Sequence, residues 1–131
     1  MRHFLAPLLR HRAGPARLID AATGTVIANQ VEAAFDSASR RRGLLGCDQW
    51  ATGRALVLAP CAAVHTCFMR FPIDVVFVDR DGRVRKVAEH VKAWRISASP
   101  RAFAAIEMAA GSAAAANLRS GSRVAISESP L

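Results

Sequence analysis

The stretch from Cys61 to Val84, CAAVHTCFMRFPIDVVFVDRDGRV, carries the side chains whose types and spacing could do chemistry. Cys61, His65 and Cys67 place two thiols around one imidazole, and both groups are donors that zinc accepts. On an extended strand His65 and Cys67 would share one face, and a thiol beside a histidine base can also act as a nucleophile. However, the spacing is not that of a standard zinc finger or ribbon, and a free cysteine is more often a small buried hydrophobe. We therefore expect neither a bound metal nor another cofactor and favour a non-catalytic protein over a thiol enzyme, although the residues leave that choice open.

Two acidic residues stand in apolar surroundings. Asp74 opens the strand-like run IDVVFVD, and Glu107 lies inside AAIEMAA. A carboxylate in such a place is costly unless it is paired or hydrogen-bonded, and Arg42, His65 and Arg70 are candidate partners for Asp74. We favour a structural role for both carboxylates, with a place at the rim of a ligand cleft as the functional alternative.

A ligand site is expected near residues 65–74, for a small molecule or a protein partner. Met69 could line an apolar pocket there with Phe68, Phe71 and Phe77, although their alternating positions are more typical of core residues. The candidate binding residues are Arg42, His65, Cys67, Met69, Arg70, Asp74 and Glu107.

The net charge of +8, from 18 Lys and Arg against 10 Asp and Glu, suggests an alternative function. Arg40–Arg42 together with Arg83, Arg85 and Lys86 could form a basic stripe that binds nucleic acid. No helix-turn-helix or zinc-finger pattern supports this alternative, and a charge run is usually a solvated face. Four of the basic residues fall within Met1–Arg17, where there is no acidic residue.

The length of 131 residues and the three cysteines set the class of protein. The length predicts one globular domain at residues 16–131, preceded by a basic, disordered tail at residues 1–15. An odd number of cysteines is unlike a secreted disulfide scaffold, so we expect reduced thiols and a cytoplasmic protein, with export by a short basic leader as the alternative. No apolar run approaches the ~20 residues of a membrane-spanning helix, and we expect no membrane partner.

Turn signals and short apolar runs predict many strands and two short helices. RLIDAATGTVIANQVEAAF predicts three strands with a turn at Thr23–Gly24, and Asp36 or Ser37 is a suitable N-cap for a helix that reaches Leu45. RALVLAP, AAVHTCFM, IDVVFVD, RVRKVAEHV and SRVAIS are expected strands, with a hairpin turn at Asp81–Gly82. FAAIEMAAG fits a strand or a helix, SAAAANLRSG a short helix, and residues 92–101 a loop. The expected fold is an α+β domain with a mainly antiparallel, curled or barrel-like sheet.

The pieces RRRGLLG, HTCFMRFPIDVVFVDRDGRV, AIEMAAG and LRSGSRV, in this order, resemble the family known as domain of unknown function 192. The resemblance covers residues 16–127 and implies a small, mostly prokaryotic protein with a compact α+β fold and no settled activity. In the commoner form of this family a longer segment separates the central Met from the Asp, and a Met often stands where this chain has Leu45. The family's motif residues here would be Arg42, Gly43, Leu44, Met69, Asp74, Asp79, Gly82, Glu107 and Gly111.

Overall fold

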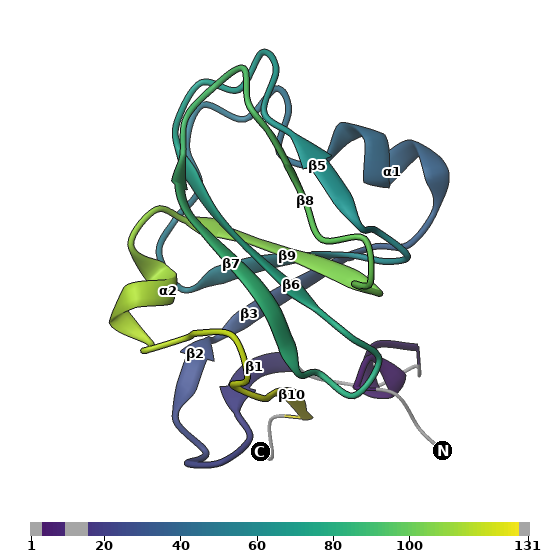
Figure 1. Cartoon of the computed structure of the whole chain (residues 1–131), viewed down its shortest axis with the longest axis vertical. Coiled ribbons are helices and arrows are strands. Elements are labelled where there is room, and N and C mark those ends of the chain that lie inside the picture. The colour runs from purple at the N-terminus through teal and green to yellow at the C-terminus, as the bar shows by residue number, and fades with distance from the viewer. Residues whose placement is uncertain (1–3, 10–15, 129–131) are drawn as a thin grey trace.

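The computed structural model describes residues 4–9 and 16–128. Its centre is a five-stranded sheet in the order β3-β4-β9-β6-β7, in which β3 and β4 are parallel and the other neighbours antiparallel (Figure 1). The strands of this sheet are β3 (Gln30–Ala34), β4 (Arg54–Leu58), β6 (Ile73–Val78), β7 (Val84–Val91) and β9 (Ala104–Ala109).

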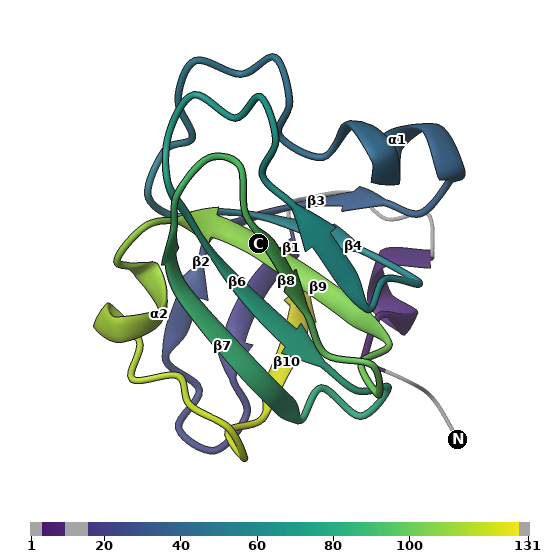
Figure 2. The ribbon, with the colours of Figure 1, turned by 45° about the horizontal axis from the view of Figure 1, so that its top comes forward.

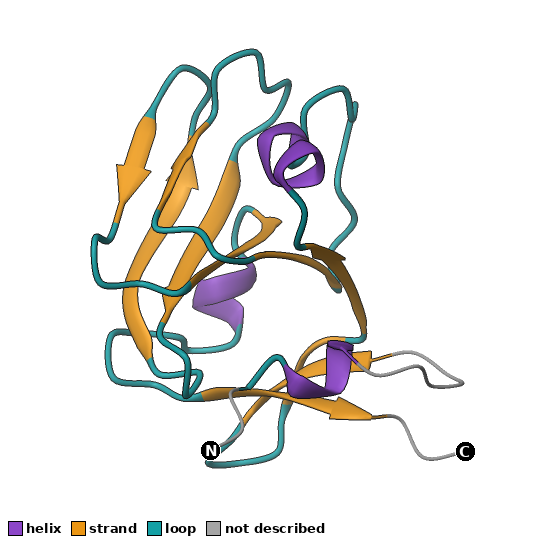
Figure 3. Cartoon of the chain, turned by 90° about the vertical axis from the view of Figure 1, so that its right-hand side faces the viewer, coloured by secondary structure: helices purple, strands orange, loops and turns teal. Residues whose placement is uncertain are grey.

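Two smaller sheets cover the central one. A three-stranded sheet has the order β10-β1-β2, and Figure 2 shows it behind β6, β7 and β9. A two-stranded sheet joins β5 and β8. The strands of the two small sheets are β1 (Ala16–Asp20), β2 (Val26–Ala28), β5 (Ala63–His65), β8 (Ile96–Ala98) and β10 (Val124–Glu128). The sheets curl without closing into a barrel, as Figure 3 shows, so the predicted α+β fold with a curled sheet is confirmed.

Strand β6 of the central sheet is buried on both faces, which explains why IDVVFV is mostly apolar at successive positions rather than alternating. Side chains alternate across a strand, so Val76 and Val78 of β6 belong to one core cluster with Leu18 and Ile126 of the three-stranded sheet. A second cluster, on the opposite face, contains Val75 and Phe77 of β6 together with Leu44, Val64 and Met69. The site described below lies on this second face.

Several local predictions are confirmed. The helix α1 (Ser37–Arg42) begins at Asp36 as predicted, and the Asp36 side chain accepts a hydrogen bond from the Ser39 N–H. It ends at Gly43, before the predicted end at Leu45. The hairpin between β6 and β7 turns at Asp81–Gly82, where a Cβ at position 82 would lie 2.1 Å from the Val124 carbonyl oxygen. Only glycine fits there. FAAIEMAAG is the strand β9, and a one-turn helix α2 (Ser112–Ala115) follows it.

Two predictions are corrected. Residues 4–9, within the predicted disordered tail, pack on the core: Phe4 and Leu5 are buried, and a 3-10 helix η1 (Ala6–Leu9) follows them. Positions 1–3 and 10–15 of the predicted tail lie outside the described residues. The predicted loop at residues 92–101 contains β8, because the main chain at Ile96–Ala98 pairs with β5, a partner more than thirty positions earlier in the chain.

Among the helices of the described residues, none is both long enough and apolar enough to cross a bilayer.

Candidate functional site: a cavity over Glu107

A cavity of about 400 Å³ lies beside the second core cluster, where α1 approaches β5 (Figure 1). Three segments form its walls: α1 with the residues after it, the loop from β4 into β5, and the turn that contains Met69. Leu44, Leu58, Val64 and Met69 give it apolar lining. The polar lining residues are Ser37, Arg40, Arg41, Arg42, His65 and Glu107, with Cys61 beside them.

Glu107 is the buried charged group of this cavity. It lies in the middle of β9, opposite Leu56 of β4 and Val75 of β6, and only 4% of its surface is exposed. Desolvation by burial raises the pKa of its carboxyl from 4.5 to about 7. Within the described part of the chain, its Oε1 is the one buried side-chain nitrogen or oxygen without a hydrogen-bond partner. A buried polar atom normally has a partner, so this oxygen has an unused hydrogen-bonding capacity beside the cavity.

Gly43 lets the chain pass close to that carboxyl. It ends α1 with a φ of 48°, in the region that favours glycine. A Cβ at this position would lie 3.2 Å from Glu107 Oε1, closer than most side chains tolerate. The backbone of Gly43, without a Cβ, can therefore pack directly beside the buried carboxyl oxygen.

Arg40 stabilises the wall of the cavity rather than its interior. Its Nη1 donates to the carbonyl oxygens of Phe35 at 2.5 Å and Ala59 at 3.4 Å, which ties α1 to the ends of two strands. Arg41 and Arg42 are exposed at the rim. The rim is therefore positively charged, while the floor carries one carboxyl group.

Cys61 also lines the cavity, but its thiol is disfavoured as a nucleophile. Burial raises the pKa of its thiol, and the nearby Glu107 carboxylate adds to that increase while Arg40 opposes it. The thiolate is the nucleophilic form, so a raised pKa disfavours the nucleophile hypothesis at this position. The thiol donates to the Ala63 carbonyl oxygen at 3.2 Å.

The structure brings together four of the residues predicted to bind a ligand. Arg42, His65, Met69 and Glu107 all line the cavity. Arg70 instead forms an exposed ion pair with Asp48. The binding role itself stays a prediction for each of these residues.

Cys67 lies beyond the end of β5, which stops two residues before it. β5 ends at His65, and the chain then turns, so Cys67 does not continue the strand. Its backbone N–H donates to His65 Nδ1 at 3.3 Å. Within residues 4–9 and 16–128, no group of three or more His, Cys, Asp and Glu side chains is placed to hold a metal ion.

Asp74 has structural partners different from the predicted ones. Its Oδ1 accepts from the His90 N–H at 2.8 Å, and its Oδ2 accepts from the N–H groups of Gly111 at 3.0 Å and Ala113 at 2.9 Å. It lies opposite Met108 in β9, and therefore on the other face of the sheet from Glu107. The structural interpretation of Asp74 fits these contacts, with backbone donors in place of Arg42, His65 or Arg70.

Some cavity residues had no distinct signal in the sequence. Ser37, Pro60 and Val64 reach the cavity because the loop after β4 returns alongside α1. The motif RRRGLLG pointed to this wall, since Gly43 and Leu44 both line the cavity. Its place next to Glu107 depends on pairing between distant strands, which a local pattern does not encode.

Comparison with known proteins places this fold in a family. Residues 18–126 match DUF192, described as an uncharacterized ACR family. The chain belongs to this family. No curated protein matches it.

Two solved structures share the fold of this DUF192 protein. One is a protein of unknown function from Novosphingobium aromaticivorans DSM 12444, with 21% identity, a TM-score of 0.72, and coverage of 84% of this chain and 82% of that one. The other is described as a putative transcription regulator from Sinorhizobium meliloti 1021, with 22% identity, a TM-score of 0.70, and coverage of 87% and 96%. At such identities the likeness establishes the fold alone.

Proposed function

We propose that this DUF192 protein is a non-catalytic module that binds a small polar molecule in the cavity over Glu107. The observation that carries the proposal is the buried Oε1 of Glu107, which has no partner among the described residues although it lines an open cavity. Leaving a buried polar atom unsatisfied costs about 1–3 kcal/mol. A hydrogen bond between this carboxyl group and a bound molecule would recover that free energy.

The size and lining of the cavity suit a small molecule. Its volume of about 400 Å³ lies within the range typical of small-molecule sites, and such sites combine apolar walls with a few polar groups. Leu44, Leu58 and Met69 supply apolar wall, and Glu107 supplies the directional group.

The charges favour an acidic ligand. Arg41 and Arg42 at the rim attract a carboxylate or phosphate group. With a pKa of about 7, the Glu107 carboxyl is protonated in a large fraction of molecules at neutral pH and can then donate to an acceptor oxygen. A small organic acid or phosphate ester fits both ends of the cavity.

Thermal unfolding of the full chain tests this proposal. We would add succinate, inorganic phosphate, adenosine monophosphate and, as a cationic comparison, spermidine. An acid present at about 100 times its Kd stabilises the fold by roughly 2.7 kcal/mol, which raises Tm by several degrees. Glu107→Leu, which removes both the donor and the acceptor, should reduce that shift strongly, whereas Glu89→Leu, the same chemical change on an exposed carboxylate of β7, should leave it intact.

Three outcomes would contradict the proposal. An unchanged Tm with all three acids would exclude acidic ligands. A rise in Tm with spermidine alone would mean that the cavity binds cations rather than anions. Equal shifts in the wild type and the Glu107→Leu variant would show that the acid binds elsewhere.

Binding to nucleic acid is the second candidate, favoured by the net charge and by the description of the Sinorhizobium meliloti structure. The basic residues of the expected stripe come from α1 and from the region of β7. Arg83 and Lys86 donate to the carbonyl oxygens of Gly121 and Ala98. If they contact phosphates, binding of a labelled oligonucleotide must fall steeply as salt rises.

A further inference from the structure

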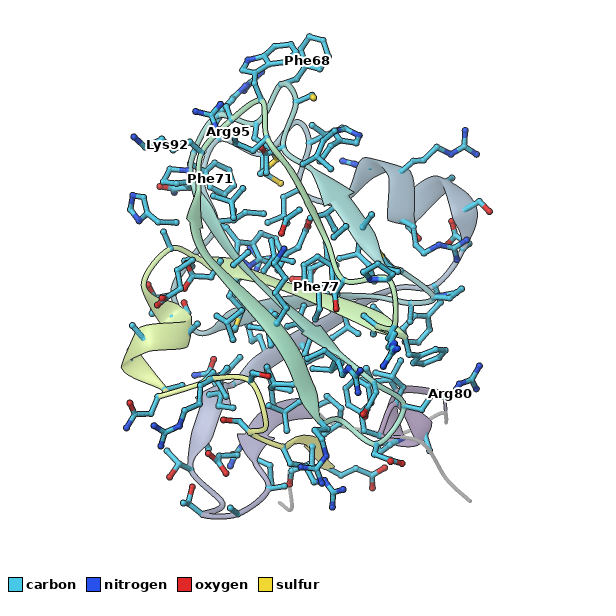
Figure 4. The ribbon with its side chains drawn as sticks, viewed as in Figure 1. Phe68, Phe71, Phe77, Arg80, Lys92 and Arg95 are labelled. Carbon is cyan, nitrogen blue, oxygen red and sulfur yellow. The ribbon has the colours of Figure 1, made fainter. Side chains whose placement is uncertain are left out.

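The end of the molecule beyond β5 and β8 exposes large apolar side chains. Phe68 is 71% exposed, Trp94 59% and Ile96 79%. Figure 4 shows Phe68 at the extreme end of the chain's long axis, with Arg95 and Lys92 just below it. The sequence pattern predicted that Phe68 is a core residue, and the structure corrects this. We call Phe68, Trp94, Lys92 and Arg95 the aromatic end.

Phe68 and Trp94 come from two loops that pack against each other. Their ring centroids lie 4.5 Å apart, with the rings tilted by 60°. Phe68 has a φ of 66° and Trp94 a φ of 65°, values that are unfavourable for bulky residues. The fold therefore holds two aromatic side chains in costly backbone conformations without using them to fill its core.

Thr66 joins the two loops. This residue is 1% exposed, its N–H donates to the Arg95 carbonyl oxygen at 2.8 Å, and its carbonyl oxygen accepts from the Trp94 N–H at 3.1 Å. Its hydroxyl donates to the Lys92 carbonyl oxygen at 2.5 Å and accepts from the Arg95 N–H at 2.9 Å. These bonds fix the aromatic end as one unit, so the two rings are presented ready for contact.

The charge around the aromatic end is positive. Lys92 and Arg95 are exposed, and no acidic residue occurs in HTCFMRF (65–71) or KAWRI (92–96). Arg95 Nη1 donates weakly to the carbonyl oxygens of its own loop, at 3.4 Å. Arg70 is paired with Asp48. Two cations therefore lie directly behind the exposed rings.

We propose that the aromatic end docks on the surface of an anionic lipid bilayer. Tryptophan favours the membrane–water interface, and lysine and arginine are attracted to anionic headgroups. With the aromatic end against a bilayer, the two rings at the extremity would enter the interface. The two cations behind them would lie near the anionic headgroups. Single-stranded nucleic acid fits less well, because it stacks its bases on aromatic faces, and here the two rings pack on each other.

This docking is peripheral. The expectation of no membrane partner rested on the absence of a long apolar run, and insertion of a few side chains at the interface needs no such run. The proposal is independent of the cavity over Glu107, which lies between α1 and β5.

Co-sedimentation of the full chain with vesicles tests the proposal. We expect binding to vesicles of phosphatidylcholine mixed with phosphatidylglycerol and weak binding to phosphatidylcholine alone. The double substitution Phe68→Ser/Trp94→Ser should lower the partition coefficient at least about tenfold. Val26→Ser, which removes an apolar side chain that is 45% exposed in β2, is the matched control and should bind as the wild type does.

A second pair of variants tests the charges. Lys92→Gln/Arg95→Gln should weaken binding by roughly tenfold or more at low salt. Arg85→Gln/Arg119→Gln changes the net charge equally at exposed positions elsewhere and should weaken it much less. A weakening of the same size in both pairs would overturn the proposal, because it would mean that net charge alone attracts the chain.

Tryptophan emission supplies a readout at the aromatic end itself. Trp94 is exposed whereas Trp50 is buried at 8% exposure, so anionic vesicles should shift the emission to shorter wavelength, and Trp94→Phe should abolish the shift. Absence of binding to anionic vesicles would overturn the proposal. So would binding of a single-stranded oligonucleotide that is lost in Phe68→Ser/Trp94→Ser while vesicle binding persists.

Discussion

Asp74 and Glu107 are two buried carboxylic acids on neighbouring strands of one sheet, and their surroundings differ. Asp74 faces the core beneath the three-stranded sheet, where it accepts three backbone hydrogen bonds. Glu107 faces the opposite side, where Oε1 has no partner and a cavity opens over it. Burial alone therefore does not tell a structural carboxylate from a candidate binding group. What differs is whether the protein itself supplies the hydrogen bonds.

Removal of Asp74 should have the largest effect on stability. Asp74→Ala leaves the N–H groups of His90, Gly111 and Ala113 without their acceptor. The bond from Ala113 is buried and the other two are partly buried, and an unsatisfied buried donor costs about 1–3 kcal/mol, so we expect a loss of roughly 3 kcal/mol in the free energy of unfolding, measured by urea denaturation. A loss below about 1 kcal/mol would show that these bonds do not hold α2 against the sheet.

Glu107→Gln should change the free energy of unfolding by a similar or smaller amount. At high pH it should raise the stability, whereas Asp74→Ala lowers it. The folded-state pKa is raised from 4.5 to about 7. The folded wild type is therefore most favoured below pH 4.5, and loses stability as the pH rises from 4.5 through 7. The difference of about 2.5 pKa units corresponds to roughly 3 kcal/mol.

Urea denaturation of both proteins between pH 5 and 8 measures this effect. Glutamine does not titrate, so the variant should gain stability relative to the wild type as the pH rises through that interval. Glu89→Gln is the control and should follow the wild-type profile. A constant difference between Glu107→Gln and the wild type would mean that burial does not raise the pKa of Glu107.

Arg70→Gln should have the smallest effect. Arg70 was a candidate for ligand binding, but its side chain is 60% exposed and pairs with an Asp48 side chain that is 82% exposed. Exposed ion pairs contribute about 0–1 kcal/mol, so we expect a loss of less than about 0.5 kcal/mol and an unchanged Tm response to acids. A reduced acid response in Arg70→Gln would extend the binding site beyond the cavity.

Local patterns predicted the elements of this fold well. The run IDVVFVD predicted β6, and Asp81–Gly82 predicted its hairpin with β7, because strand and turn preferences act between near neighbours. Asp36 predicted the start of α1 for the same reason. β8 was missed because ISA has a weak strand signal and depends on its distant partner β5.

The sequence alone could not predict that Asp74 has a structural role and that Glu107 lines a cavity. The donors to Asp74 lie 16, 37 and 39 positions away, and no nearby residue indicates them. The cavity over Glu107 likewise exists only because α1 lies beside the loop from β4 into β5. Alternation with its neighbours predicts a core position for Phe68, and that prediction fails because the chain leaves β5 after His65 and Phe68 has a φ of 66°.

The raised pKa of Glu107 couples any occupancy of the cavity to protons in solution. A molecule that accepts a hydrogen bond from the carboxyl must bind the protonated form, so the protein takes up protons from the buffer as it binds. A molecule that donates to Oε1 would release them. Above pH 7 the affinity for an acceptor should therefore fall by about tenfold for each pH unit. The heat of binding should also vary with the ionisation enthalpy of the buffer, so the bound chemical class can be recognised by calorimetry.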